Sequence, residues 1–218
     1  MNERNDFGSY APDILSHRLY AKASPYTVLN VGIGTGAEAI PLFNLYAQYS
    51  RLPQLYLGTN VVTPPDFRLT EEFMQTRFPT IPFEYRNGFF MEDGIGTESV
   101  SLFLASRVAE WSDDPIRWFS EAYRSLQPGG IGIVHSSRQF PRFDNAVINE
   151  VLQEAGIATI LVDRAPDLDQ YTETNRIYLY KPHNDAMTEF PDWVETNPHR
   201  FETHFNALSA TSHRRDVI

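Results

Sequence analysis

Residues 28–36 read Val28-Leu29-Asn30-Val31-Gly32-Ile33-Gly34-Thr35-Gly36, a short apolar run that passes into three glycines at alternate positions. Glycine has no Cβ and tolerates positive φ, so a strand that ends in this way lets the backbone pass close to a ligand. A helix that follows presents its free N–H groups at the same place. The pattern also closes ordinary strand-to-helix connections, so the stretch alone leaves a nucleotide-binding turn and a plain turn open.

The rest of the chain supplies the context for this turn. From Val28 onward, short apolar runs alternate with longer amphipathic ones, which is typical of β–α units that build a parallel sheet. We predict strands over 28–31, 54–60, 83–86, 99–105, 131–135, 157–162 and 176–180, the last two as an antiparallel edge. Helices are predicted over 37–50, 70–78, 115–126 and 145–155, with a loop over 163–174. Asp113 or Asp114 is expected to cap the third helix, and Gly156 to end the fourth.

Two segments lie outside this predicted core of residues 25–182. Residues 1–24 contain an amphipathic stretch, a candidate helix that packs on the sheet or lies over the cleft as a lid. Residues 183–218 are polar with scattered aromatic residues, which suggests a C-terminal appendage and a candidate dimer contact. The oligomeric state stays open at this point.

Composition excludes several classes of function. The chain has 18 basic and 28 acidic residues and a net charge of −10, which disfavours nucleic acid as the partner. It has no cysteine, so disulfides, thiolate metal sites and cysteine nucleophiles are impossible. The six histidines lack the spacing of metal ligands. No apolar run approaches the ~20 residues that cross a bilayer. We therefore expect a cytoplasmic protein with neither a metal nor a membrane partner.

Two blocks together resemble the class I S-adenosylmethionine-dependent methyltransferases, especially the small-molecule branch. The first block is the glycine-rich stretch 28–36, and the second is Trp118-Phe119-Ser120-Glu121-Ala122-Tyr123-Arg124-Ser125-Leu126-Gln127-Pro128-Gly129-Gly130. The pattern Glu-x-x-Arg-x-Leu-x-Pro-Gly-Gly of the second block is the more specific. The resemblance spans roughly residues 26–181 and implies an α/β fold: a doubly wound, seven-stranded, mostly parallel Rossmann-like sheet. It also implies methyl transfer to a small molecule, with S-adenosylmethionine held by Gly32, Gly34, Gly36 and Asn60.

A nicotinamide-dependent oxidoreductase is the competing enzyme class. Gly32-x-Gly34-x-x-Ala37 also satisfies the dinucleotide fingerprint. The Pro-Gly-Gly turn before the fifth strand favours the methyltransferase, because dinucleotide binding does not require that turn.

The sequence departs from the family at four positions where acidic residues are usual. Asn30 stands in the first motif, Asn60 ends the second strand, Phe89 follows Gly88 after the third, and Ser101 opens the fourth. A neutral amide accepts weaker hydrogen bonds from a ribose than a carboxylate does. The cofactor is then held by backbone groups, Asn30 and Asn60, with Phe89 or Phe90 against adenine. Alternatively, the scaffold has become a non-catalytic binding protein.

The polar residues near the strand ends supply the candidates for chemistry. His135, at the end of the fifth strand, is the candidate general base, and it could equally cap the strand. Arg138 is a candidate anchor for an anionic substrate. Ser106, after the fourth strand, is a candidate substrate-binding residue because the resembled family positions substrate there. The identity of the methyl acceptor is not encoded in these motifs.

Overall fold

The computed structural model describes residues 26–33, 43–44, 47, 52–61, 67–91, 94–106, 108–137, 144–162 and 174–181. For 67–70, 135–137, 160, 162 and 174–176 it describes the backbone alone. The predicted lid (1–24), the predicted C-terminal appendage (183–218) and residues 163–173 of the predicted loop 163–174 lie outside these residues, whereas Thr174 already belongs to a strand. So does most of the predicted helix 37–50, of which Phe43, Asn44 and Ala47 are described as helical.

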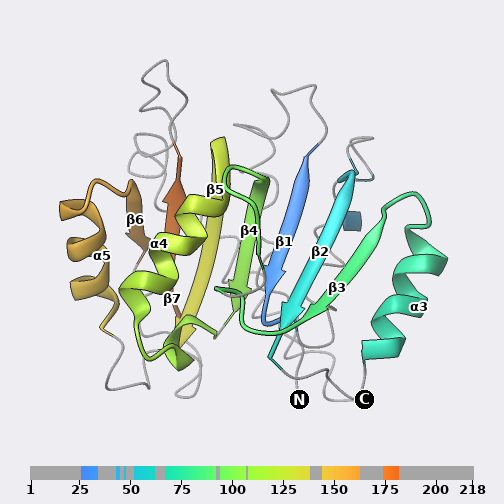
Figure 1. Ribbon diagram of the computed structural model, residues 1–218, viewed down its shortest axis with the longest axis horizontal. Coiled ribbons are helices and arrows are strands. Elements are labelled where there is room, and N and C mark those ends of the chain that lie inside the picture. Colours follow the sequence, from blue (N-terminus) through green and yellow to red (C-terminus); the bar gives the residue numbers. More distant parts are fainter. Residues whose placement is uncertain are drawn as a thin grey trace, which may run out of the picture.

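One sheet of seven strands organises the described residues, in the order β3-β2-β1-β4-β5-β7-β6 (Figure 1). The strands are β1 (Thr27–Val31), β2 (Leu55–Asn60), β3 (Phe83–Asn87), β4 (Val100–Ser106), β5 (Leu126–Ser137), β6 (Thr159–Val162) and β7 (Thr174–Tyr180). Strands β1 to β5 pair in parallel, whereas β7 is antiparallel to both β5 and β6. The predicted mostly parallel sheet with an antiparallel edge is confirmed.

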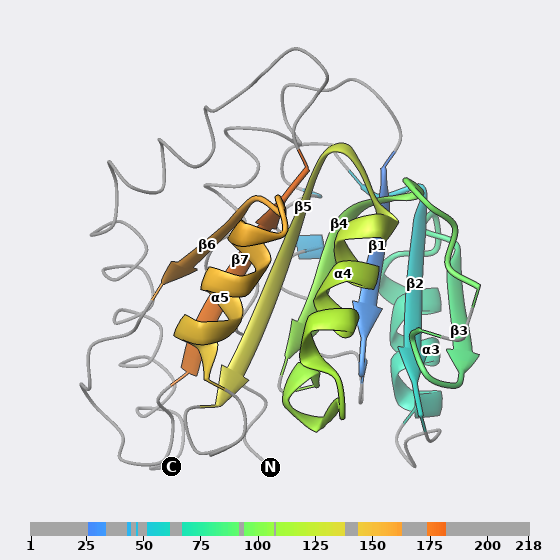
Figure 2. The same cartoon turned by 60° about the vertical axis from the view of Figure 1, so that its left-hand side comes forward.

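Helices cover both faces of this sheet (Figures 1 and 2). They are α3 (Phe67–Arg77), α4 (Pro115–Ser125) and α5 (Asn145–Glu154), and a short 3₁₀ turn, η3 (Ala109–Trp111), follows β4. Met74 of α3 belongs to one buried cluster, and Phe119 of α4 and Leu152 of α5 belong to another. The doubly wound arrangement is therefore present in the described part. None of the described helices is long and apolar enough to cross a bilayer.

Strand β4 shows why the central strands read as continuous apolar runs. Leu102 and Leu104 lie in the cluster that contains α3, whereas Phe103 and Ala105 lie in the cluster that contains α4 and α5. Side chains alternate across a strand, so a strand covered on both faces needs apolar residues at every position.

The start of β5 differs from the prediction. The strand was expected to begin at Ile131, but Leu126 already pairs with Val100, and Ile131 pairs with Leu102. Between these two pairs, β5 advances from residue 126 to residue 131, whereas β4 advances only from residue 100 to residue 102. Residues 127–130 of β5 therefore form a bulge. Sequence periodicity contains no information on the strand opposite, which is why this boundary was wrong.

This bulge is the Pro-Gly-Gly turn of the second block. Gly129 has φ of 79°, a left-handed conformation that favours glycine. Its N–H donates to the carbonyl of Lys181 at 2.6 Å, and the Lys181 N–H donates to the carbonyl of Gly130 at 3.1 Å. A Cβ on Gly130 would lie 2.8 Å from the carbonyl oxygen of Gln127. The turn therefore joins the start of β5 to the end of β7.

Arg124 of α4 fixes the chain that leads into β4. Its guanidinium donates to Glu121 Oε2 at 2.6 Å, to Thr97 Oγ1 at 2.6 Å and to the carbonyl of Ile95 at 3.1 Å. The Glu-x-x-Arg part of the second block thus ties a helix to a loop at the amino end of β4.

Candidate functional site

The candidate site lies where the strand order reverses. Strands β1, β2 and β3 follow one another toward one edge, and the chain then returns to place β4 on the other side of β1. In open α/β sheets, ligands bind beyond the carboxyl ends of the strands at such a switch point. The predicted glycine turn ends β1 at this point.

Backbone hydrogen bonds hold the glycine turn against β2. The N–H groups of Gly32 and Ile33 both donate to the carbonyl of Thr59, at 2.8 and 3.0 Å. Gly32 has φ of 67°, and a Cβ there would lie 2.1 Å from Cγ2 of Val108. The first glycine is therefore required both by its backbone conformation and by the segment after β4. Gly34 and Gly36 lie outside the described residues.

A second glycine in β2 makes room for the turn. A Cβ on Gly58 would lie 2.3 Å from Cδ1 of Ile33, whose side chain is buried. Ile33 thus packs directly on the backbone of β2, and the turn is fixed from both sides. A glycine inside a strand is itself a sign that another group approaches the backbone closely, and Gly58 could have indicated this contact from the sequence.

Two asparagines join the ends of β2 and β3. Asn60 Oδ1 accepts a hydrogen bond from the N–H of Val61 at 3.0 Å, and the Asn60 carbonyl accepts from the N–H of Gly88 at 2.8 Å. The amide orientation that satisfies both groups of Asn87 places its nitrogen 3.0 Å from the carbonyls of Asn60 and Val61. Asn60, predicted to contact the cofactor, lies partly exposed at this edge. Asn87 was not predicted, because its role depends on the neighbouring strand.

Asn30 lies deeper than the edge. Its side chain is fully buried in β1, and Nδ2 donates to the hydroxyl of Tyr56 at 3.0 Å. Its Oδ1 has no hydrogen-bond partner among the described residues.

The placement of Ser101 corrects an expectation. It is one of the four positions where the sequence departs from the acidic pattern of the family, but its Oγ accepts a hydrogen bond from the N–H of Thr27, at 3.3 Å, where β1 begins. Ser101 therefore lies near the amino ends of β1 and β4, the opposite edge of the sheet. Its neutral side chain does not alter the candidate site.

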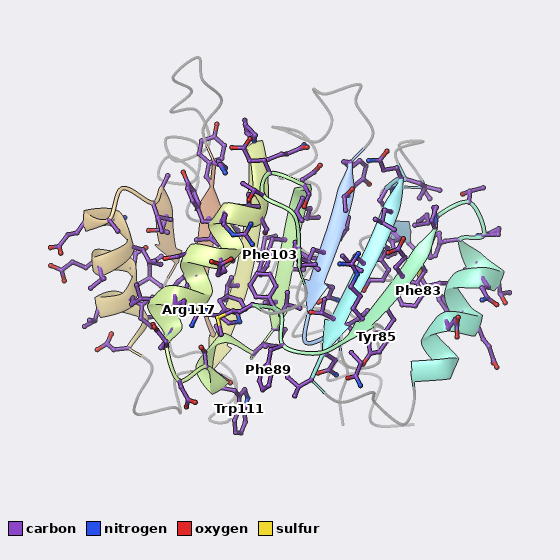
Figure 3. All side chains as sticks on the ribbon, in the orientation of Figure 1. Phe83, Tyr85, Phe89, Phe103, Trp111 and Arg117 are labelled. Carbon is purple, nitrogen blue, oxygen red and sulfur yellow. The ribbon has the colours of Figure 1, made fainter. Side chains whose placement is uncertain are left out.

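The two phenylalanines after β3 have different surroundings. Phe90 is 7% exposed, and its ring packs edge-on against Phe103 of β4 and Trp118 of α4, at centroid distances of 5.3 and 5.6 Å. Phe89 is 53% exposed and lies at the carboxyl edge of the sheet (Figure 3). Of the two, Phe89 has the face that a ligand could contact.

His135 and Ser106 meet at the same edge. They are register partners at the ends of β5 and β4, and His135 also pairs with Arg176 of β7. The backbone thus brings the candidate base and the candidate substrate-binding residue next to each other. Arg138 lies outside the described residues.

The ionisable groups of the described chain contain no cluster of His, Asp and Glu that could hold a metal. Burial raises the pKa of the Tyr123 phenol, and Tyr180 adds to this effect. Lys181 Nζ lies 5.4 Å from the centre of the Tyr123 ring. Because Lys181 pairs with the Pro-Gly-Gly turn, this tyrosine lies at the amino edge of the sheet, away from the candidate site.

Comparison with known proteins identifies the fold. No protein-family model matches the sequence, and no curated protein is significantly similar to it. Among solved structures, the trans-methyltransferase CalH in complex with S-adenosylhomocysteine (SAH) has a TM-score of 0.59 and 16% identity, covering 81% of this chain and 57% of CalH. A putative S-adenosylmethionine-dependent methyltransferase from Methanococcus maripaludis has a TM-score of 0.57 and 16% identity, covering 84% and 88%.

The DszA carbon methyltransferase has a TM-score of 0.58 and 16% identity, covering 77% of this chain. The present chain spans half the length of that protein, 50%. The chain therefore has the fold of class I S-adenosylmethionine-dependent methyltransferases, as the sequence predicted.

Proposed function

We propose that this protein transfers a methyl group from S-adenosylmethionine to a small-molecule acceptor. The observation that carries the proposal is the glycine turn at the switch point, where the N–H groups of Gly32 and Ile33 are hydrogen-bonded to Thr59 and Val108 lies against Gly32. Solved proteins of this fold include complexes with SAH and with S-adenosylmethionine. A fixed turn at the carboxyl end of β1 is the feature that such a ligand requires from the scaffold.

The residues at the edge are compatible with this cofactor. Asn60 offers an amide at the end of β2, where a ribose would be held, and Asn87 fixes the backbone around it. Phe89 offers an exposed ring for adenine. Gly34 and Gly36 would complete the glycine turn. When bound, the cofactor supplies a methyl group on a sulfonium, which already carries its leaving group.

Alignment is then the main task of the protein residues. Holding an acceptor atom in line with the methyl group can supply several kcal/mol of the barrier. His135 and Ser106, adjacent in the backbone register, are the candidates for holding and deprotonating a hydroxyl or amine acceptor. Arg138 would orient an acidic group of the acceptor.

Calorimetric titration tests the proposal. We expect S-adenosylmethionine and SAH to bind with micromolar affinity, and Gly34→Asp to abolish binding because it adds a carboxylate to the turn. Gly94→Asp is the control, because nothing lies within 4 Å of a Cβ at Gly94 and its loop precedes β4.

Absence of binding by both sulfur compounds would overturn the proposal. Binding of a nicotinamide dinucleotide alone would then favour the oxidoreductase. Binding of none of the three would favour a repurposed binding protein, for which Asn60 and Phe89 are the supporting departures.

A further inference from the structure

One row of register partners marks where three neighbouring strands change from apolar to polar. Ser106 of β4 pairs with His135 of β5, and His135 pairs with Arg176 of β7 (Figure 1). We call these three residues the polar row. On the core side of the row the residues of all three strands are apolar or aromatic and buried, over 102–105, 131–134 and 177–180. The polar row is therefore the boundary between the core and the edge of the sheet where the candidate site lies.

The polar row begins at the glycine turn. Strands β1 and β4 pair as far as Val31 and Ala105, so the residues that follow, Gly32 and Ser106, lie at the same level. From there the row crosses β5 and ends in β7, three strands away from β1. Neighbouring strands lie about 4.8 Å apart, so the row extends about 14 Å from the glycine turn to Arg176. That span suits a small acceptor lying between the cofactor and Arg176.

Arginines stand at the ends of these three strands. Arg107 follows β4, Arg138 follows β5 and Arg176 lies in β7 itself. Residues 106–107, 135–138 and 174–176 contain no carboxylate. An arginine directly opposite a histidine is an unfavourable cross-strand pair whenever the imidazole is protonated, because both groups are then positive. A carboxylate bound at the row would offset this repulsion.

Carboxylates of this chain compete for the same arginine. Val162, the last residue of β6, also pairs with Arg176, and Asp163 follows it, while Glu173 precedes β7. The connections 107–114, 138–144 and 163–173 together contain eight carboxylates and four arginines.

The charge of these connections is therefore negative, and direct contact has to outweigh it. At physiological ionic strength, solvent screens charges that lie more than about 8 Å apart. A guanidinium and a carboxylate in contact form short charge-assisted hydrogen bonds that are screened much less. An anion is thus bound at the row only by an arginine that touches it.

We propose that Arg176 binds a carboxylate of the methyl acceptor and so selects an anionic acceptor. This inference rests on the proposed function, because it takes the strand ends at Ser106 and His135 as the acceptor half. A guanidinium binds a carboxylate through two parallel hydrogen bonds, a geometry that a lysine cannot reproduce. Arg138, the candidate anchor named above, would then act beside Arg176 on the same acidic group.

Three planar probes of matched size test the inference. Acetate is negative, acetamide is neutral and acetamidinium is positive. Each is titrated at constant ionic strength into isotope-labelled full-length protein saturated with SAH, and the amide NMR signals of 135–137 and 174–177 report binding. The proteins are the wild type, Arg176→Gln, Arg176→Lys, Arg138→Gln and Arg77→Gln. Arg77 is the matched control, because it is exposed and ends α3, before β3 begins at the opposite edge of the sheet.

We expect the wild type to bind acetate about tenfold more tightly than acetamide, and acetamidinium to leave these amide signals unshifted. Arg176→Gln should weaken acetate binding about tenfold and leave acetamide binding unchanged. Arg176→Lys should weaken it about threefold, because the charge remains and the paired hydrogen bonds are lost. Arg138→Gln should cost less than Arg176→Gln, and Arg77→Gln should change nothing. The affinity for SAH should be the same in all five proteins, and circular dichroism shows whether each is folded.

Several results would overturn the inference. Equal binding of acetate and acetamide, or no shift at these amides with any probe, would remove the carboxylate site. Tighter binding of acetamidinium would show that the carboxylates of 163–173 control this edge. An equal loss in Arg77→Gln would reduce the effect to general attraction, and a loss in Arg138→Gln alone would assign the carboxylate to Arg138. Failure of SAH to bind the wild type would instead contradict the proposed function.

Discussion

At the residue scale, Gly32 and Gly94 form a matched pair of glycines. Their φ angles are 67° and 65°, but a Cβ on Gly32 would meet Val108 at 2.1 Å, whereas a Cβ on Gly94 would have no contact within 4 Å. We expect Gly94→Ala to lower the free energy of unfolding by about 1 kcal/mol, the cost of left-handed backbone. Gly32→Ala should lower it by about 3 kcal/mol, because overpacking adds to the strain. Urea unfolding measures both, and equal losses would mean that Val108 moves aside freely.

Asn60 is the residue where the site departs most directly from an acidic pattern. Its Oδ1 accepts from the N–H of Val61, and a carboxylate could accept that bond as well. Asn60→Asp should therefore tighten SAH binding by about fivefold at neutral pH, because charge-assisted hydrogen bonds are stronger by roughly 1 kcal/mol. The gain should disappear as the pH falls through the pKa of the new carboxyl group. Calorimetry at neutral and acid pH measures the effect.

Asn87 supplies the control for this substitution. In the amide orientation that satisfies both groups of its side chain, its nitrogen donates to the carbonyls of Asn60 and Val61, and a carboxylate cannot donate. Asn87→Asp should thus weaken SAH binding, although it adds the same charge to the same edge. Tighter binding in both variants would show that general electrostatic attraction, rather than the hydrogen bond at Asn60, is responsible.

At the element scale, the start of α4 shows which residue caps the helix. The sequence predicted that either Asp113 or Asp114 caps this helix. In the structure Asp114 is the cap, because its Oδ1 accepts a hydrogen bond from the N–H of Arg117 at 3.0 Å. Asp114→Ala should lower the free energy of unfolding by about 1 kcal/mol, the usual cost of losing a cap. Asp113→Ala, one residue earlier and exposed, should change it by less than about 0.5 kcal/mol. Urea unfolding compares the two variants, and a larger loss in Asp113→Ala would contradict the assignment.

The elements themselves could be predicted because their signals are local. Periodicity predicts β4, buried on both faces, and the positive φ of Gly156, 79°, agrees with its expected place at the end of α5. The most specific block, with Arg124 and the Pro-Gly-Gly turn, lies at the amino edge of the sheet, where it ties α4, β5 and β7 together. That block therefore identified the fold and contains no information on the chemistry at the other edge.

The site was harder to predict because its contacts join distant segments. Val108 over Gly32, and Thr59 bonded to the glycine turn, appear only when β4 and β2 lie beside β1. From the sequence, Phe90 was as good a candidate for the adenine contact as Phe89, but in the structure its ring packs against Trp118 of α4. The sequence therefore predicted that the site lies at the strand ends, but it did not show which side chains there are exposed to a ligand and which are buried.

At the scale of the whole molecule, the sheet should differ in stability from centre to edge. Strand β4 is hydrogen-bonded to β1 and β5, and six of its seven residues are buried. Within the part of the chain that the structure describes, strand β3 pairs with β2 alone, and none of its residues is fully buried. We expect the amides of β4 to exchange with solvent only by global unfolding, and those of β3 by smaller openings of lower free energy. Hydrogen exchange at increasing urea separates the two, because global opening depends strongly on denaturant.

Ligand binding should stabilise some strands of the sheet against local opening more than others. A cofactor held by the glycine turn and Asn60 spans the ends of β1 and β2, so SAH should slow exchange in β2 and β3 more than in β6 and β7, where it makes no contact. The antiparallel strands β6 and β7 serve as the internal control, because the same protein and the same spectrum report both halves. Equal protection of the two halves would mean that SAH stabilises only the globally folded state, and greater protection of β6 and β7 would place the ligand on the wrong side of the switch point.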